Sequence, residues 1–253
     1  MIYDLQKASL LKRASAWLLD MILLCVLVVG IASVLSGLLK YDSYYTTLND
    51  CKSQYEKQYG VSFNITEDDY NAMTEAQRKV YDEAMAAMNA DEKALIAYNM
   101  LINLSLVIVS ISVLLAYLAL EFGIPVLFGN GQTVGKKVFA IGVMKSNGVK
   151  VNTISMFVRT LLGKFTIETM VPLLIVLMML WGMIGIVGPM VILALAVVQV
   201  VMMVTSRTNS PIHDSLAQTV AVDLHSQLIF GDEDALMEYK KRVHEEMVRR
   251  SPY

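Results

Sequence analysis

The stretch that decides the fold is ASAWLLDMILLCVLVVGIASVLSGLL, which runs from Ala14 to Leu39 and is interrupted only by Asp20 and small hydroxyl side chains. At about 1.5 Å per residue, a helix of this length crosses a hydrocarbon core of about 30 Å with length to spare. Because Lys7, Lys12 and Arg13 precede it, a cleaved signal peptide is the competing interpretation. The apolar run is longer than the roughly 7 to 15 residues typical of such a peptide, so we expect a first transmembrane helix.

The whole composition agrees with a membrane protein. Hydrophobic residues make up 55% and charged residues 17% of the 253 residues, and the mean hydropathy is +0.51. Further apolar runs cover residues 95–122 and 171–204, and the second of these is too long for one span. Gly188 and Pro189 predict a break, giving helices over 168–187 and 190–206 as a short hairpin. Each helix is short, so a re-entrant hairpin stays open as an alternative.

The segments between the apolar runs are polar. In residues 40–94, Thr66 with Asp69 and Thr74 with Gln77 have the spacing of capping boxes, which predicts two or three short helices. After residue 123, Val138–Lys145 and Val149–Val151 flank Asn147-Gly148, a pattern typical of a β-hairpin on a type I′ turn. We expect an interfacial helix to follow, and an amphipathic helix over residues 233–249.

Lys and Arg counts give the orientation. The segment before the first helix holds three basic residues, and residues 123–168 hold six with one acidic residue, whereas residues 40–94 hold six basic and eleven acidic residues. Since cytoplasmic loops are enriched in Lys and Arg, both termini should be cytoplasmic and the 40–94 loop should lie outside. The predicted fold is an all-α polytopic membrane protein with four transmembrane helices, a small cytoplasmic β-hairpin and an outer helical loop domain. The expected segments are 1–39 (N-terminal segment and helix 1), 40–94 (outer loop), 95–122 (helix 2), 123–167 (hairpin and interfacial helix), 168–206 (helices 3 and 4) and 207–253 (cytoplasmic C-terminal segment).

Charged residues in or near the bilayer are the candidates for function. Asp20 lies within the first span, where a carboxylate costs about 2.5 to 3.5 kcal/mol unless it is paired, protonated or hydrated. Glu121 should lie at a similar depth, and two nearby carboxylates would form a proton carrier or a cation site. A purely structural Asp20, bonded to a neighbouring helix, is the alternative. Lys136 and Lys137 follow glycines but lack phosphate-loop spacing, and they suit anionic lipid headgroups or a plain positive-inside loop.

Four short motifs stand out: Lys12-Arg13-Ala-Ser-Ala-Trp17-Leu-Leu-Asp20, Gly131-Gln-Thr133-Val-Gly135-Lys136-Lys137, Asn147-Gly148 with Arg159, and His213-Asp214-Ser-Leu-Ala217-Gln-Thr219-Val. Together they resemble the RDD family of small membrane proteins, which is named for one arginine and two aspartates. The resemblance covers roughly residues 7–39 and 120–222. It implies that Arg13, Asp20 and Asp214 are the name-giving residues. Members look like transporters, some associated with exchange of monovalent cations for protons, while others look like assembly partners of larger complexes.

We therefore expect a transporter-like protein whose ion or proton site is formed by Asp20, Glu121 and Asp214. Arg13, Arg159, Lys136 and Lys137 would balance charge or bind lipid phosphate. Four spans form a thin pathway, so transport would require a homo-oligomer. The alternative is a non-catalytic membrane partner or scaffold that binds other proteins through its outer loop and tail. We expect no enzyme activity, no metal or other cofactor, and no nucleic-acid partner; the expected partners are the bilayer, anionic headgroups, monovalent cations and protons.

Overall fold

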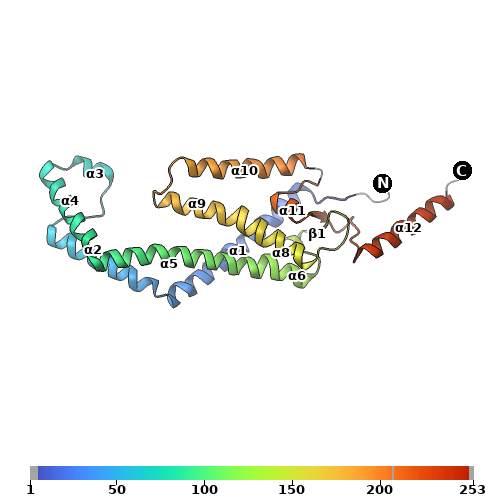
Figure 1. Cartoon of the computed structure of the whole chain (residues 1–253), viewed down its shortest axis with the longest axis horizontal. Coiled ribbons are helices and arrows are strands. Elements are labelled where there is room, and N and C mark those ends of the chain that lie inside the picture. Colours follow the sequence, from blue (N-terminus) through green and yellow to red (C-terminus); the bar gives the residue numbers. More distant parts are fainter. Residues whose placement is uncertain (1–4, 207, 251–253) are drawn as a thin grey trace. The chain divides into compact units, whose positions relative to one another are not determined.

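The computed structural model describes residues 5–206 and 208–250, and these residues are mostly helical (Figure 1). They form two compact units. One unit contains the chain as far as Leu27 and again from Leu114 onward, and the other is Val28–Val113. Helices α1 and α5 each continue from one unit into the other.

Within the described residues, four helices are long and apolar enough to cross a membrane, as predicted. The first is α1 (Leu10–Leu38), and the second, Glu92–Phe128, consists of α5 (Glu92–Tyr117), the π-helical segment η1 (Leu118–Gly123) and α6 (Ile124–Phe128). The third is Thr153–Leu180 and the fourth is α10 (Val187–Thr205). The chain is therefore a helical membrane protein.

The third span corrects two predictions, the separate interfacial helix after the hairpin and the start of the third membrane helix at residue 168. It is one continuous helix made of α8 (Thr153–Phe157), the π-helical segment η2 (Val158–Met170) and α9 (Val171–Leu180), so no separate interfacial helix exists at 153–164. Asn152 caps its start by accepting a hydrogen bond from the Ser155 amide at 2.8 Å. The basic residues of this segment, Arg159 and Lys164, contact the acidic Asp214 and Glu121 of other elements, so they need not face water.

The break between the last two helices also lies earlier than predicted. α9 ends at Leu180, and Gly182 adopts a positive φ of 68° in the turn that follows. Gly188 and Pro189 lie in the first turn of α10, where proline is tolerated because the first amides of a helix have no internal partner. α9 and α10 lie side by side (Figure 1).

A two-stranded sheet replaces the predicted hairpin. β1 (Ile141–Lys145) pairs antiparallel with β2 (Thr219–Asp223), with Val143 opposite Ala221. Residues 149–151 form no strand of their own: they contribute isolated bridges between Met144 and Lys150 and between Val149 and Phe230, and the Lys145 amide donates to the Val149 carbonyl oxygen at 2.9 Å. Gly148 has a positive φ of 93° but Asn147 does not, so the type I′ turn was also wrong. The distant β2 is the better partner because its Val220 and Val222 are fully buried there.

The apolar core beneath the sheet connects it to the first helix. Ala8, Ala16, Ile141 and Ala221 form one buried cluster, which packs α1 and the residue preceding it against both strands. A short helix precedes each strand in the sequence: α7 (Val134–Val138) precedes β1, and α11 (Ile212–Leu216) precedes β2. This packing places the motif residues of the N-terminal helix next to those of the loop and the C-terminal segment.

The second unit contains α2 (Tyr41–Tyr59), α3 (Glu67–Ala72) and α4 (Glu75–Ala90). Both predicted capping boxes are present: Thr66 with Asp69 starts α3, and Thr74 with Gln77 starts α4. Each box satisfies two amides that the first helical turn leaves unpaired. The helical prediction for this region is confirmed.

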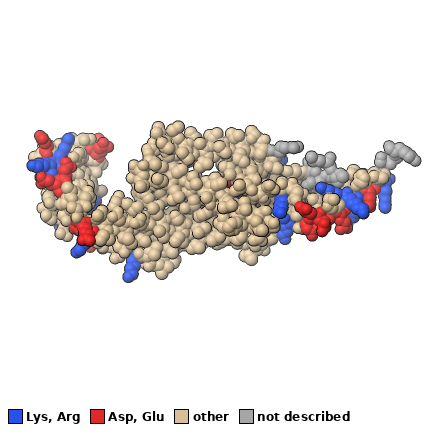
Figure 2. Space-filling view, viewed as in Figure 1, with Lys and Arg blue, Asp and Glu red and all other residues tan. Residues whose placement is uncertain are grey.

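The predicted C-terminal helix is also present as α12 (Glu233–Arg250). Leu236 on its apolar side is buried, and the Tyr239 ring lies 5.1 Å from that of Phe230. Figure 2 shows charged side chains gathered on α12 and on the helices of the second unit, whereas the visible face of the membrane helices is almost free of them. This distribution agrees with lipid contact along the apolar helices.

Candidate functional site

Asp20 on α1 is held by the start of α7, through its N-cap residue Thr133 and its second residue Gly135. The Thr133 hydroxyl donates to its Oδ2, and the Gly135 amide donates to its Oδ1 at 2.7 Å. A Cβ atom at Gly135 would lie 2.2 Å from the Ala16 carbonyl oxygen, so glycine is required for this close approach. Among the described residues, no basic nitrogen lies within 4.0 Å of the Asp20 carboxylate.

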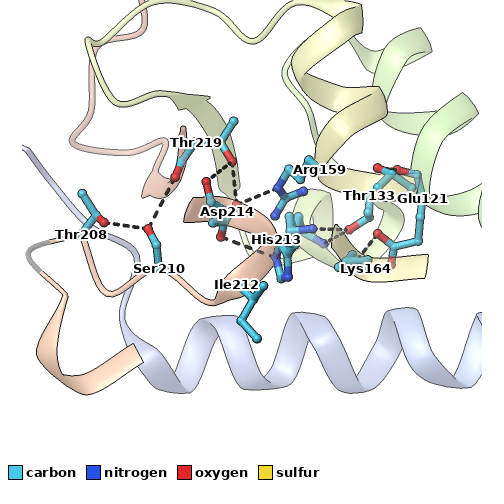
Figure 3. A network of polar contacts seen from close by, with 12 residues as sticks. Glu121, Thr133, Arg159, Lys164, Thr208, Ser210, Ile212, His213, Asp214 and Thr219 are labelled. Carbon is cyan, nitrogen blue, oxygen red and sulfur yellow. Dashed lines mark hydrogen bonds and ion pairs between the residues drawn. The ribbon is translucent and has the colours of Figure 1, made fainter. Parts of the chain in front are cut away.

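Asp214 on α11 lies between two guanidinium groups, those of Arg13 and Arg159. Figure 3 shows Asp214 with Arg159 and Thr219. Arg159 Nε donates to its Oδ1 at 2.7 Å, and Arg13 Nη2 lies 3.6 Å from its Oδ2. Thr219 donates a further hydrogen bond to Oδ1 at 2.8 Å. The nearby Arg159 offsets the effect of burial and holds the pKa of Asp214 well below its usual range, so this carboxylate stays ionised.

Glu121 on η1 forms an ion pair with Lys164 on η2, with 2.6 Å between Oε2 and Nζ. The Thr160 hydroxyl also donates to the Glu121 carbonyl oxygen at 3.0 Å, which ties the second and third membrane helices together. Lys164 was not predicted as a site residue. Lys164 lies five positions after Arg159. On an α-helix this spacing puts two side chains about 140° apart. In a π-helix, residues five apart are joined by backbone hydrogen bonds.

Glu168 and His213 form a second pair that the sequence analysis missed. His213 Nδ1 lies 2.8 Å from Glu168 Oε2, and its Nε2 lies 3.6 Å from Asp214 Oδ2. Burial lowers the pKa of His213, although both carboxylates act in the opposite direction. The 45 residues between the partners left no local signal in the sequence.

The two predicted lysines have different surroundings. Lys137 is exposed, with its Nζ 3.8 Å from the centre of the Phe128 ring. Lys136 instead reaches Thr133 Oγ1 at 3.5 Å. Burial and the neighbouring Lys164 and Arg159 lower the pKa of Lys136 to about 7.

These groups surround one cavity of about 610 Å³ within the first unit. Apolar side chains of α1 and α10, including Trp17, Met21 and Met203, form part of its wall. The structure thus brings Asp20, Glu121 and Asp214 to one cavity, although no direct contact joins them. The charged side chains that line the cavity are Arg13, Asp20, Glu121, Lys136, Arg159, Lys164, Glu168 and Asp214, together with the titratable His213.

The described residues offer no cluster of metal-binding side chains. No group of three or more His, Cys, Asp and Glu side chains is placed to hold a metal ion in the part of the chain that the structure describes. The carboxylates are instead bonded to basic side chains or to neutral donors.

These features define the class of the protein. It is a helical membrane protein with a charged cavity between its first span and its terminal segments. The chain belongs to the RDD family, whose family model matches residues 7–218. The match confirms the resemblance and includes the motifs that hold Arg13, Asp20 and Asp214. No curated protein and no solved structure matches the chain.

Proposed function

We propose that this protein exchanges monovalent cations for protons across the membrane, with the cavity as its ion site and Asp20 as the exchanging carboxylate. The observation that carries the proposal is the position of Asp20 on the cavity without a basic side chain in contact. A carboxylate held by two neutral donors keeps its negative charge uncompensated by an ion pair. A proton or a small cation in the cavity can supply that compensation.

The other carboxylates fit supporting roles. Glu121 contacts Lys164 and Asp214 contacts Arg159, so each already has a cationic partner. We assign them to charge balance and to the alignment of the membrane helices, and we assign Arg13 to the same network. This refines the initial hypothesis, in which three carboxylates shared the ion.

We propose that both termini are cytoplasmic and that the chain spans the cell membrane several times. The excess of Lys and Arg in the N-terminal segment and in residues 123–168 supports this orientation. The small sheet and α12 would then be cytoplasmic, and α2 to α4 would lie outside. Lys137 would face the anionic headgroups of the inner leaflet. We also propose that the transporting form is a homo-oligomer.

The experiment is ion exchange in proteoliposomes. Gradients of sodium, lithium or potassium should each be tested for proton release, with Asp20→Asn as the key variant. We expect exchange by the wild-type protein and none by Asp20→Asn. Asp223→Asn is the matched control, because Asp223 pairs with Lys12 at 2.6 Å and does not line the cavity.

Two results would refute the proposal. Absence of exchange for all three cations would favour the alternative, a membrane scaffold that binds other proteins through the second unit and α12. Wild-type exchange by Asp20→Asn would show that another group carries the ion.

A further inference from the structure

The basic groups of the cavity are not fully paired. Arg159 is 1% exposed, and its Nη1 has no hydrogen-bond partner among the described residues, although its Nε donates to Asp214. A buried donor without an acceptor costs about 1 to 3 kcal/mol, and more when the group is charged. Arg159 lines the cavity, so an acceptor inside the cavity could satisfy this donor.

Lys136 is a second basic group on the same cavity that has no acidic side chain in contact within the described part of the chain. Among the described residues, no carboxylate oxygen lies within 4.0 Å of its Nζ. Its one hydrogen bond, to Thr133 Oγ1, is 3.5 Å long. Lys164 and Arg159 lower its pKa more than Asp20 and Glu121 raise it. Lys136 therefore experiences a net positive environment.

Among the described residues, the carboxylates on the cavity form no ion pair with Lys136 and no hydrogen bond with Arg159 Nη1. Asp20 accepts one hydrogen bond on each oxygen from Thr133 and Gly135. Asp214 lies between Arg13 and Arg159, but only its Oδ1 is hydrogen-bonded: its Oδ2, 3.6 Å from Arg13 Nη2, has no hydrogen-bond partner among the described residues. Protein groups alone leave Arg159 Nη1 and Lys136 Nζ without an anionic partner.

The wall of the cavity adds information about the ligand. Leu10, Trp17 and Met21 of α1 and Met203 of α10 line it together with the basic residues. An inorganic ion would use only the charged part of such a cavity. An anion attached to an apolar body would use both parts.

We propose that the cavity binds an oxyanion, a phosphate or a carboxylate, between Arg159 and Lys136, with an attached apolar chain lying along α1 and α10. Arginine offers paired N–H donors to such oxyanions, and lysine adds a compact charge. A membrane lipid or a free anion could supply the same group. The inference goes beyond the proposed exchange, since it concerns a ligand of the opposite charge.

The test is ligand binding by the purified full-length protein in a neutral detergent, without any ion gradient. The probes are dioctanoyl-phosphatidylglycerol, dioctanoyl-phosphatidylcholine and inorganic phosphate, followed by tryptophan fluorescence and by the thermal unfolding midpoint. We expect saturable binding of phosphatidylglycerol but not of phosphatidylcholine, which has the same chains without net charge. Binding of inorganic phosphate alone would also support the site and would identify a free anion as its ligand.

Variants separate the site from general surface charge. Lys136→Gln should weaken phosphatidylglycerol binding by about ten- to a hundredfold, the loss expected for one hydrogen bond to a charged group. Lys137→Gln is the matched control and should bind as the wild type, because this neighbouring lysine does not line the cavity. Arg159→Lys should also weaken binding while keeping the charge that Asp214 requires.

Equal binding of the two lipids, or equal losses in Lys136→Gln and Lys137→Gln, would overturn the proposal. So would the absence of binding for phosphatidylglycerol and phosphate alike. Asp20→Asn should retain phosphatidylglycerol binding even where it abolishes exchange. Failure of the exchange proposal therefore leaves this inference standing, and the reverse also holds.

Discussion

The two units of the molecule use polar residues in opposite ways. In the first unit, the polar groups are buried and their partners are distant in sequence, as with Arg159 and Asp214, which are 55 residues apart. In the α2 to α4 region, the capping hydrogen bonds of Thr66 and Thr74 are exposed and join residues three apart.

This difference teaches where the energy of each unit resides. A buried ion pair is strongly destabilising when one partner is removed, because the other charge is left without compensation. An exposed cap contributes about 1 kcal/mol and affects only its own helix. Substitutions in the first unit should therefore act on the whole fold, and substitutions in the caps should act locally.

The largest effect is expected for Arg159→Met. The change keeps much of the side-chain volume but leaves Asp214 buried with Arg13 as the remaining guanidinium, 3.6 Å away. We expect a loss of about 3 to 5 kcal/mol in unfolding free energy, measured by denaturation in mixed detergent micelles. The double variant Arg159→Met, Asp214→Asn should lose less than the sum of the two single changes. Additive losses would show that the two residues are not coupled.

The second prediction concerns the close contact between α1 and the first turn of α7. In Gly135→Ala, the new Cβ would lie 2.2 Å from the Ala16 carbonyl oxygen and 2.9 Å from Asp20 Cγ. The backbone must move apart, at a cost of about 1 to 3 kcal/mol. Gly30→Ala on the same helix is the control, because nothing lies within 4 Å of its Cβ. Equal stability of the two variants would contradict the observed approach.

The third prediction is a pH dependence caused by Lys136. Its pKa falls from 10.5 to about 7 on folding, so between these values the unfolded state binds more protons than the folded state. The contribution of Lys136 to stability therefore rises with pH in this window, by no more than about 1.4 kcal/mol per pH unit. Denaturation from about pH 7.5 to pH 9 should show a steeper rise for the wild type than for Lys136→Met. Lys137→Met should retain the wild-type slope, and a wild-type slope in Lys136→Met would exclude this assignment.

The same contrast explains what the sequence could predict. The apolar runs that became α1, α5 and α10 are visible in hydropathy alone, and the capping boxes at Thr66 and Thr74 need only a spacing of three residues. Both are local signals. They identified the membrane helices and the starts of α3 and α4.

The errors were in non-local features. β1 pairs with a strand 74 residues further along, at Thr219↔Lys145, so the nearby Asn147-Gly148 suggested the wrong partner. Lys164 pairs with Glu121, 43 residues away on another membrane helix, and no local pattern in the sequence connects the two. His213 lacked any regular spacing to Glu168. Asp20 and Glu121 were singled out because a carboxylate in or at the end of an apolar run is conspicuous without knowledge of its partner, whereas Asp214 was singled out by the resemblance to the RDD family.

The smallest effect is expected for Thr74→Ala at the start of α4. The change removes the hydroxyl that accepts from the Gln77 amide and frees the Gln77 side chain from the Thr74 amide. We expect a loss of about 1 kcal/mol in the local stability of the first turn, measured as faster amide hydrogen exchange near Gln77. Thr74→Ser keeps the hydroxyl and should exchange as the wild type. If Thr74→Ala instead accelerated exchange across α1 and the sheet, this cap would contribute to the whole fold, and the contrast between local and distributed stability would be wrong.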